Sequence, residues 1–333
     1  MTGAGAIGPA IVDAGITLRC LGLRRGWPDP RGISRPAQIL HEVRPDILQT
    51  WLYHADLLGL VMLSLGQAPR LVWGLHASDA PGVAGLRHIL AWASGRPDAV
   101  VTVSQSGRRF HESVGYHPRQ WVHIPNGFDT QALRPDAEAR RRGRKQFGIA
   151  DDAVAILLPA RYHPIKDHKT FLAAAAALAA MRTDCRFFLA GSETGPGNRE
   201  LASAVASHGL AERLTLLGER GDLDALYPAF DIVTLSSSAG EAMPLVLGEA
   251  MACGIACVAT DIGDCAAVIG DTGIVVPPRD PSALAAAWQH LLALGPEARQ
   301  LLGARARDRV LRHYALDVTV SRYAALYEEI ADN

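Results

Sequence analysis

The sequence has few of the features that mark secreted, membrane-spanning or nucleic-acid-binding proteins. Its five cysteines are an odd and scattered set among 333 residues, which fits a reducing compartment better than a disulfide framework. No apolar run approaches the ~18 residues of a membrane span, and no charged segment precedes an apolar one as in a signal peptide. The net charge of −1 gives no overall attraction to nucleic acid or anionic membranes. These absences predict a soluble, cytoplasmic protein without a nucleic-acid partner.

Several kinds of catalytic centre are also absent. The sequence holds no G-x-S-x-G nucleophile elbow and no cluster with metal-ligand spacing. Cys253 and Cys257 have three residues between them, not the two of a redox or zinc pair, so we interpret them as small core residues. Asp222 and Asp224 spell D-x-D, a metal–diphosphate pattern, but the same positions suit the cap and first turn of a short helix. We favour the helix and predict no required divalent metal.

The sequence does hold a regular alternation of apolar, strand-like runs and helical segments. With 49% hydrophobic residues, it can build the cores of about two domains of ~150 residues each. The strands expected in the first half lie at 16–23, 46–50, 70–75, 99–104 and 121–125. Strands that alternate with helices in this way predict parallel α/β sheets. We therefore expect two Rossmann-like domains at 1–148 and 149–312, and a C-terminal helix at 313–333 that packs back on the first domain.

The most informative stretch follows the expected strand at 231–235. It reads S-S-S-A-G-E-A-M-P-L-V-L-G-E-A-M-A-C-G. Pro244 suits the first turn of a helix, and Gly254 can end that helix in the left-handed conformation. Free backbone N–H groups at such a helix start can bind phosphate or sugar oxygens. Glu241 and Glu249 bracket this turn, and the apolar surroundings of Glu249 favour a function over an ordinary surface role.

The two glutamates, with seven residues between them, resemble the E-x7-E signature of retaining GT-B glycosyltransferases, in particular the group-4 family of nucleotide-sugar-dependent enzymes. The text around them is similar to that family along its whole length, although Ala242 and Met243 stand where many members have an aromatic residue and a glycine. The resemblance implies a GT-B fold, in which two Rossmann-like domains face each other across a cleft. It also implies transfer of a sugar from a nucleotide-diphospho-sugar with retention of configuration.

The first half carries weaker signs of the same family. Residues 44–56 resemble its R-P-D-hydrophobic-H-T-H segment, with Gln49 where histidine is frequent, and residues 125–129 match its N-G-hydrophobic-D turn. Family members begin with a strand, a glycine-rich loop and a long helix ahead of anything that matches residues 8–23. We therefore expect a shortened first domain that lacks roughly 60 residues. Either the reading frame starts late or the chain is a shortened and impaired variant.

The resemblance also implies roles for single residues. Arg161 and Lys166 are similar to the R-x4-K pair that holds the donor diphosphate, where preorganised cations would stabilise the charge of the departing group. Glu241 would position sugar hydroxyls, Glu249 would accept hydrogen bonds from the ribose, and His76 would reach the sugar from the opposite domain. The other expected substrate contacts are Ala242, Met243, Pro244, Leu245, Arg220 and Asn126. From the residues alone, His76 could equally be an ordinary hydrogen-bonded residue and the two cations solvated.

The expected partners follow from the same resemblance. They are a nucleotide sugar, with a UDP-sugar favoured, and a glycan or lipid-linked acceptor, with a peripheral contact at the inner face of the membrane. The cations at 140–145 are either a basic surface for such a contact or, as we favour, a solvated connector between domains. Two alternatives stay open: a truncated, non-catalytic subunit that binds nucleotide sugar, and a GT-B sugar-nucleotide epimerase.

Overall fold

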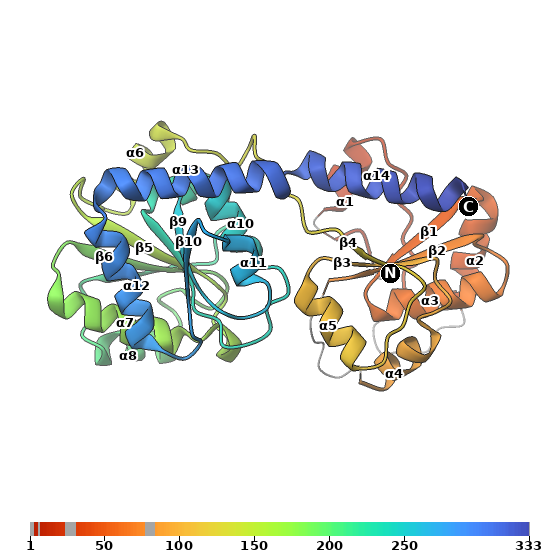
Figure 1. The fold of residues 1–333 in the computed structure, drawn as a ribbon, viewed down its shortest axis with the longest axis horizontal. Helices are drawn as coiled ribbons and strands as arrows, with labels where there is room; N and C mark the ends of the chain where they lie inside the picture. The colour runs from red at the N-terminus through yellow and green to blue at the C-terminus, as the bar shows by residue number, and fades with distance from the viewer. Residues whose placement is uncertain (1–2, 6, 24–30, 77–83, 333) are drawn as a thin grey trace.

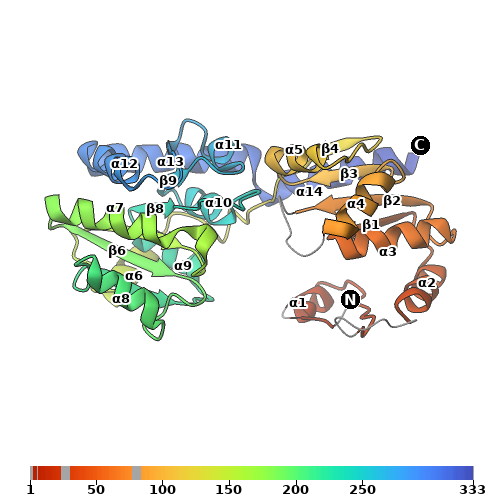
Figure 2. The ribbon, with the colours of Figure 1, turned by 90° about the horizontal axis from the view of Figure 1, so that it is seen from below.

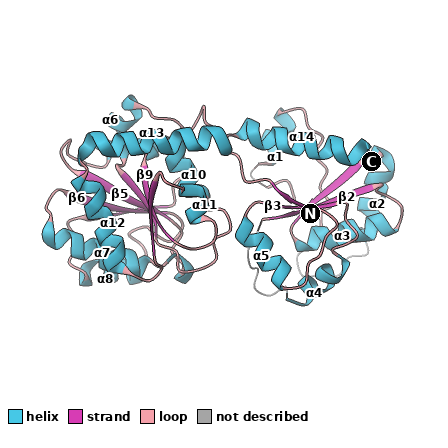
Figure 3. Ribbon diagram, in the orientation of Figure 1, coloured by secondary structure: helices cyan, strands magenta, loops and turns pink. Residues whose placement is uncertain are grey.

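The structure, a computed structural model, describes residues 3–5, 7–23, 31–76 and 84–332. It holds two α/β domains, each built on one parallel sheet, as Figures 1 and 3 show. The expected architecture of two parallel-sheet domains is therefore confirmed. Within the described residues, no helix is both long enough and apolar enough to cross a membrane.

The first domain is a four-stranded sheet in the order β1-β2-β3-β4. Its strands are β1 (Ile47–Trp51), β2 (Arg70–Leu75), β3 (Ala99–Thr102) and β4 (Trp121–His123). Its helices are α1 (Gly8–Asp13), α2 (Arg31–Val43), α3 (Tyr53–Ser64), α4 (Ala84–Ala93) and α5 (Gln105–Ser113). One face of the sheet packs on α3 and α4 through Trp73 and Leu90. The other face packs on the C-terminal helix α14 (Leu316–Asp332) through Val72, Val101 and Leu326.

The strand predicted at 16–23 is wrong. This segment is irregular, its side chains are largely exposed, and Figure 2 shows it with α1 apart from the sheet. Its apolar pattern suits a strand, but a strand needs a neighbour for its backbone N–H and C=O groups. Among the described residues, β1 pairs only with β2, and the segment pairs with no strand. The sheet is therefore one strand smaller than we expected.

The second domain has a six-stranded sheet in the order β10-β9-β8-β5-β6-β7. Its strands are β5 (Val154–Pro159), β6 (Cys185–Ala190), β7 (Leu214–Gly218), β8 (Ile232–Leu235), β9 (Ala256–Thr260) and β10 (Gly273–Val276). Its helices are α6 (Ala137–Gln146), α7 (His168–Met181), α8 (Arg199–Ser207), α9 (Leu223–Leu226), α10 (Leu245–Ala252), α11 (Cys265–Ile269), α12 (Pro281–Ala293) and α13 (Gly295–His313), with 3-10 turns η1 (Pro164–Lys166) and η2 (Tyr227–Ala229). The strand order reverses between β5 and β8, and parallel sheets bind ligands at such a switch point.

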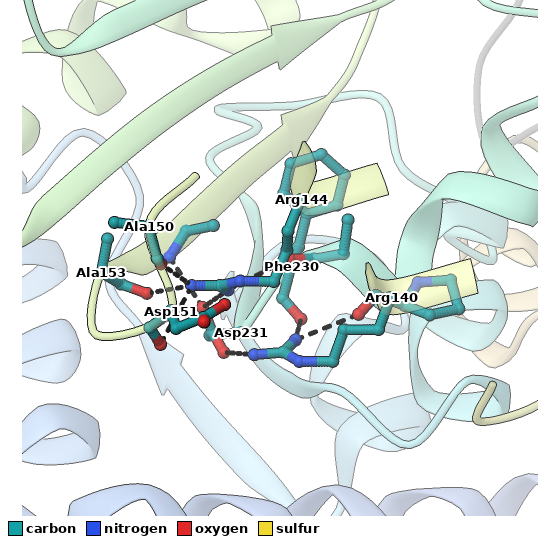
Figure 4. Close-up of polar contacts among 10 residues, drawn as sticks. Arg140, Arg144, Ala150, Asp151, Ala153, Phe230 and Asp231 are labelled. Carbon is teal, nitrogen blue, oxygen red and sulfur yellow. Dashed lines mark hydrogen bonds and ion pairs between the residues drawn. The ribbon is translucent and has the colours of Figure 1, made fainter. Parts of the chain in front are cut away.

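The basic segment before the second sheet is a helix fixed to that domain, so the prediction of a solvated connector is wrong for two of its arginines. Figure 4 shows Arg140 and Arg144 of α6 on either side of Asp231. Arg140 Nη2 lies 2.6 Å from Asp231 Oδ1, and Arg144 Nη1 lies 3.1 Å from Oδ2. Arg144 also donates to the Ala153 carbonyl at 2.7 Å, and its side chain is only 6% exposed. The carboxylate of Asp231, just before β8 and distant in sequence, supplies the partner that burial of arginine requires.

Two segments cross between the domains side by side. Phe128 N–H donates to the Tyr314 carbonyl at 2.8 Å, and Leu316 N–H donates back to the Phe128 carbonyl at 2.9 Å. Beyond this crossing, α14 continues the direction of α13 and lies along the first domain, as the blue helices of Figure 1 show. Thr319 Oγ1 donates to the Pro125 carbonyl at 3.1 Å, which fixes the start of α14.

Candidate active site

Three loops meet at the carboxyl ends of β5, β8 and β9. Ser238 N–H donates to the Ile165 carbonyl at 2.8 Å, and Ser236 Oγ donates to the Lys166 carbonyl at 2.9 Å. Asp264 N–H donates to the Ala242 carbonyl at 3.0 Å. These bonds join the loop after β5, the loop after β8 and the loop after β9 into one surface at the edge where parallel sheets bind ligands.

At the centre of this surface, Lys166 Nζ forms an ion pair with Glu241 Oε1. Ser237 Oγ donates to the same oxygen at 2.5 Å. Glu241 is only 8% exposed, and a buried carboxylate without partners would be costly. Gly263 packs against the backbone of Glu241 with φ of +62°. A Cβ at this position would lie 2.0 Å from the Glu241 carbonyl oxygen, so only glycine fits there. The structure therefore brings Lys166 and Glu241 together. It adds Ser237, which lies in the stretch that begins at residue 236 but had no predicted role, and Gly263.

The two other predicted cations lie outside this ion pair. Arg161 is exposed just after β5, and among the described residues its guanidinium has no hydrogen-bond or ion-pair partner. Arg220 instead binds Asp222 with both ends of its fork, at 2.8 Å and 2.7 Å. Asp222 is the residue before α9, as predicted, but its side chain binds Arg220 and makes no capping bond to the helix. Within the described part of the chain, no group of three or more His, Cys, Asp or Glu side chains could hold a metal ion.

Glu249 lies on α10 and faces α9 and η2. Tyr227 Oη donates to Glu249 Oε2 at 2.8 Å. Burial raises the pKa of Glu249, and the hydrogen bond from Tyr227 works against that rise. Tyr227 is itself fully buried and 22 residues earlier in the chain, so no spacing rule could have found it.

The start of α10 leaves polar backbone groups available. Pro244 is the residue before the helix, one position earlier than predicted, and Gly254 follows its end with φ of +74° as predicted. Among the described residues, nothing accepts a hydrogen bond from the amides of Ala242, Met243 or Leu245. Helix amino ends with free N–H groups attract anionic oxygens.

The first domain contributes two predicted residues to this region. Asn126 N–H lies 3.1 Å from Met243 Sδ, so these two positions meet across the domains. His76 is an exposed residue just after the carboxyl end of β2, and desolvation by the surrounding protein lowers its pKa. Its ring makes no hydrogen bond to another described residue.

A hollow of about 630 Å³ lies beyond β5, towards β6 and β7. Its lining includes Tyr162, Asn198, Glu200 and Gly218. Tyr162 Oη donates to Glu200 Oε1 at 3.0 Å, which fixes one wall. The hollow extends from the loop that carries Arg161 and Lys166.

Two family models match this chain. Residues 153–293 match the model described as Glycosyl transferases group 1, and residues 3–132 match Glycosyltransferase Family 4. A D-inositol 3-phosphate glycosyltransferase of Geodermatophilus obscurus is 31% identical over 247 residues, which are 70% of this chain and 53% of that protein. The N-acetyl-alpha-D-glucosaminyl L-malate synthase of Bacillus anthracis is 25% identical over 305 residues, which are 89% and 78% of the two chains. The chain thus spans about half the length of the first of these relatives.

Solved structures share the fold. A glycosyltransferase from Rickettsia africae ESF-5 superposes with a TM-score of 0.87 at 19% identity, over 99% of this chain and 89% of that one. Anabaena Alr3699/HepE in complex with UDP gives a TM-score of 0.82 at 21% identity, over 89% and 82%. The two family models together cover most of the chain, so it belongs to the group-4 glycosyltransferases and has their GT-B fold.

Proposed function

We propose that this protein transfers a sugar from a nucleotide-diphospho-sugar to a glycan or lipid-linked acceptor, with retention of configuration. The observation that carries the proposal is the ion pair between Lys166 and the buried Glu241 carboxylate, beside the free amides at the start of α10. A UDP-sugar is the favoured donor, and the solved complexes of HepE with UDP and with UDP-glucose support that choice. We place the reaction in the cytoplasm, with a peripheral contact at the inner face of the membrane.

The charges suit a donor of this kind. Lys166 is already beside Glu241, so a diphosphate that binds Lys166 and Arg161 would bring its sugar next to the Glu241 carboxylate. That carboxylate would accept hydrogen bonds from sugar hydroxyls, and Glu249 would accept them from the ribose. The amides of Ala242, Met243 and Leu245 would donate to phosphate or sugar oxygens.

In the proposed step, the acceptor hydroxyl oxygen forms a bond to the anomeric carbon on the face that the diphosphate leaves. The bond between that carbon and the phosphate oxygen breaks, and the acceptor proton passes to the departing phosphate. Lys166 and Arg161 would stabilise the negative charge that grows on the leaving group. His76, whose pKa is lowered by desolvation, would donate to a sugar hydroxyl from the first domain. We propose that no divalent metal is required.

The test is a panel of nucleotide sugars and acceptors, with products identified by mass spectrometry and their anomeric configuration by NMR. Lys166→Ala and Glu241→Gln should each lower transfer at least about 100-fold, because each removes a charge next to the reacting centre. Lys169→Ala is the matched control, since Lys169 is an exposed lysine on the adjacent turn of α7 and should leave transfer unchanged. EDTA should have no effect.

The same panel separates the alternatives. Nucleotide binding without transfer to any acceptor would support the non-catalytic subunit. A new nucleotide sugar formed without an acceptor would support the epimerase. Full activity of the Lys166→Ala enzyme would remove the proposed site.

A further inference from the structure

One carboxylate of the second domain makes two short hydrogen bonds to the first domain. Asp264 precedes α11 and is only 6% exposed. Its Oδ2 accepts from Gln105 N–H at 2.7 Å and its Oδ1 from Ser106 N–H at 2.8 Å. These amides are the first two of α5, in the first domain. Figures 1 and 2 both place α11 beside α5, so the contact lies where the domains face each other.

The amino end of α5 is thus capped by two domains. The first N–H groups of a helix have no partner within it. Ser104, the residue before α5, accepts from Gly107 N–H at 3.0 Å and so serves the third amide from within the first domain. The first two amides depend on Asp264 instead. A carboxylate at a helix amino end is favourable, and its hydrogen bonds are charge-assisted.

Asp264 is also joined to the candidate active site. Its own N–H donates to the Ala242 carbonyl at 3.0 Å, next to Glu241. The preceding residue, Gly263, lies directly against the Glu241 carbonyl. The side chain of Asp264 therefore holds the first domain while its backbone holds the loop that carries Glu241. If the domains separate, the carboxylate and both amides pass to water, and the loop loses this connection to the opposite domain together with the Asn126–Met243 contact.

We propose that Asp264 is a positioning residue that keeps the first domain closed against the Glu241 loop during transfer. This inference rests on the proposed glycosyl transfer. Asp264 would not touch the substrates. It would act by holding the first domain, which carries the acceptor, in place over the donor bound to the second domain. A misplacement of about 1 Å at a reacting centre can cost about 100-fold in rate, so loss of this contact should lower turnover more than donor binding.

The first test needs no activity. Asp264→Ala should speed hydrogen exchange at the Gln105 and Ser106 amides and increase the radius of gyration measured by small-angle scattering. Ser104→Ala is the control, because it removes a cap at the same helix end from within the first domain. It should speed exchange at Gly107 and leave the radius of gyration unchanged. Wild-type protection of Gln105 and Ser106 in Asp264→Ala would overturn the proposal.

The second test separates positioning from stability. Asp264→Ala should lower the kcat of transfer at least about tenfold, while the Kd for UDP measured by calorimetry stays within about threefold of wild type. Asp264→Asn, which keeps one acceptor oxygen, should fall between. Equal kcat losses in Asp264→Ala and Ser104→Ala would show that helix stability, not closure, matters. If wild type shows no transfer while Asp264→Ala still opens, the proposed function fails and the domain contact stands.

Discussion

Two buried carboxylates illustrate how this protein handles charge at single residues. Glu241 is held by Lys166 and Ser237, both within hydrogen-bond reach of one oxygen. Asp56 on α3 is fully buried, and among the described residues its carboxyl group accepts one hydrogen bond, from Thr50 Oγ1 at 2.6 Å. Burial raises the pKa of Asp56 to about 7. Glu241 thus has a compensating cation at the site, whereas Asp56 avoids its charge by keeping a proton.

This difference predicts a pH effect on stability. The pKa of an unfolded Asp is ~3.9, and burial raises the pKa of Asp56 in the folded protein to about 7. Between these values the folded state binds the extra proton, so the contribution of Asp56 is full below about pH 4 and is lost as pH rises to about 7. Asp56→Asn should remove that dependence. Urea unfolding from about pH 4 to about pH 8 measures it, and parallel profiles for the two proteins would contradict the assignment.

The Lys166–Glu241 pair should also couple in stability. Lys166→Met leaves the buried Glu241 carboxylate with Ser237 alone and should cost about 1–3 kcal/mol. Combining it with Glu241→Gln should recover at least about 0.5 kcal/mol relative to the sum of the single changes. A double-mutant cycle by urea unfolding measures this coupling energy. Strict additivity would show that the two side chains do not interact in solution.

Among the elements, α6 departs most from the prediction that its composition gave, a solvated connector between domains. Residues 140–145 hold five cations, and a charge-rich segment is usually solvated. Arg141 and Arg142 fit this rule, since both pair with Glu138 on the exposed side of the helix. Arg140 and Arg144 do not, because both form ion pairs with Asp231 and donate hydrogen bonds to nearby carbonyls.

This contrast gives a matched pair of variants on one helix. Arg144→Met should destabilise the second domain by about 3–5 kcal/mol, because it leaves Asp231 and several carbonyls without their donor. Arg142→Ala should change stability by less than about 0.5 kcal/mol, as exposed ion pairs contribute little. Chemical denaturation compares the two. Equal effects would mean that the buried arrangement adds nothing.

Two of the predicted strands show that an apolar run alone is not sufficient to form a strand. The run at 70–75 forms β2 with the predicted bounds, because it is flanked by strands on both sides. The run at 16–23 has a similar apolar character but no neighbour, and it forms no strand. The β-branched and apolar residues create a preference for extended backbone, whereas hydrogen-bond partners from elsewhere in the chain decide whether a sheet strand results.

At the scale of the whole molecule, α14 forms part of the core of the first domain although it comes last in the chain. Leu326 and Ile330 pack with Val72, Val101 and Ile124. The chain reaches this helix only after it has completed the second domain. The stability of the first domain therefore depends on residues that follow its sheet by about 200 to 250 positions in the chain.

Leu326→Ala should test this dependence. Leu326 is 4% exposed, so its truncation should cost about 2–4 kcal/mol, and the loss should appear as faster hydrogen exchange in β2 and β3 with β5 and β8 unchanged. Val320→Ala on the same helix is the control, since Val320 is 57% exposed. If exchange rose equally in both domains, the two would unfold as one unit.

By itself, the sequence determined the parallel α/β class, the turn from residue 236 to Gly254 and the residues that resemble the donor site. Periodic apolar runs and short-range turn chemistry act over a few residues, so they can be read locally. Only the tertiary structure decided that Lys166 lies against Glu241, that Tyr227 binds Glu249 and that Asp264 caps α5 across the domains. Each of these contacts joins residues of different elements, 22 to 159 positions apart in the chain, so the packing of those elements decides them and no local pattern does.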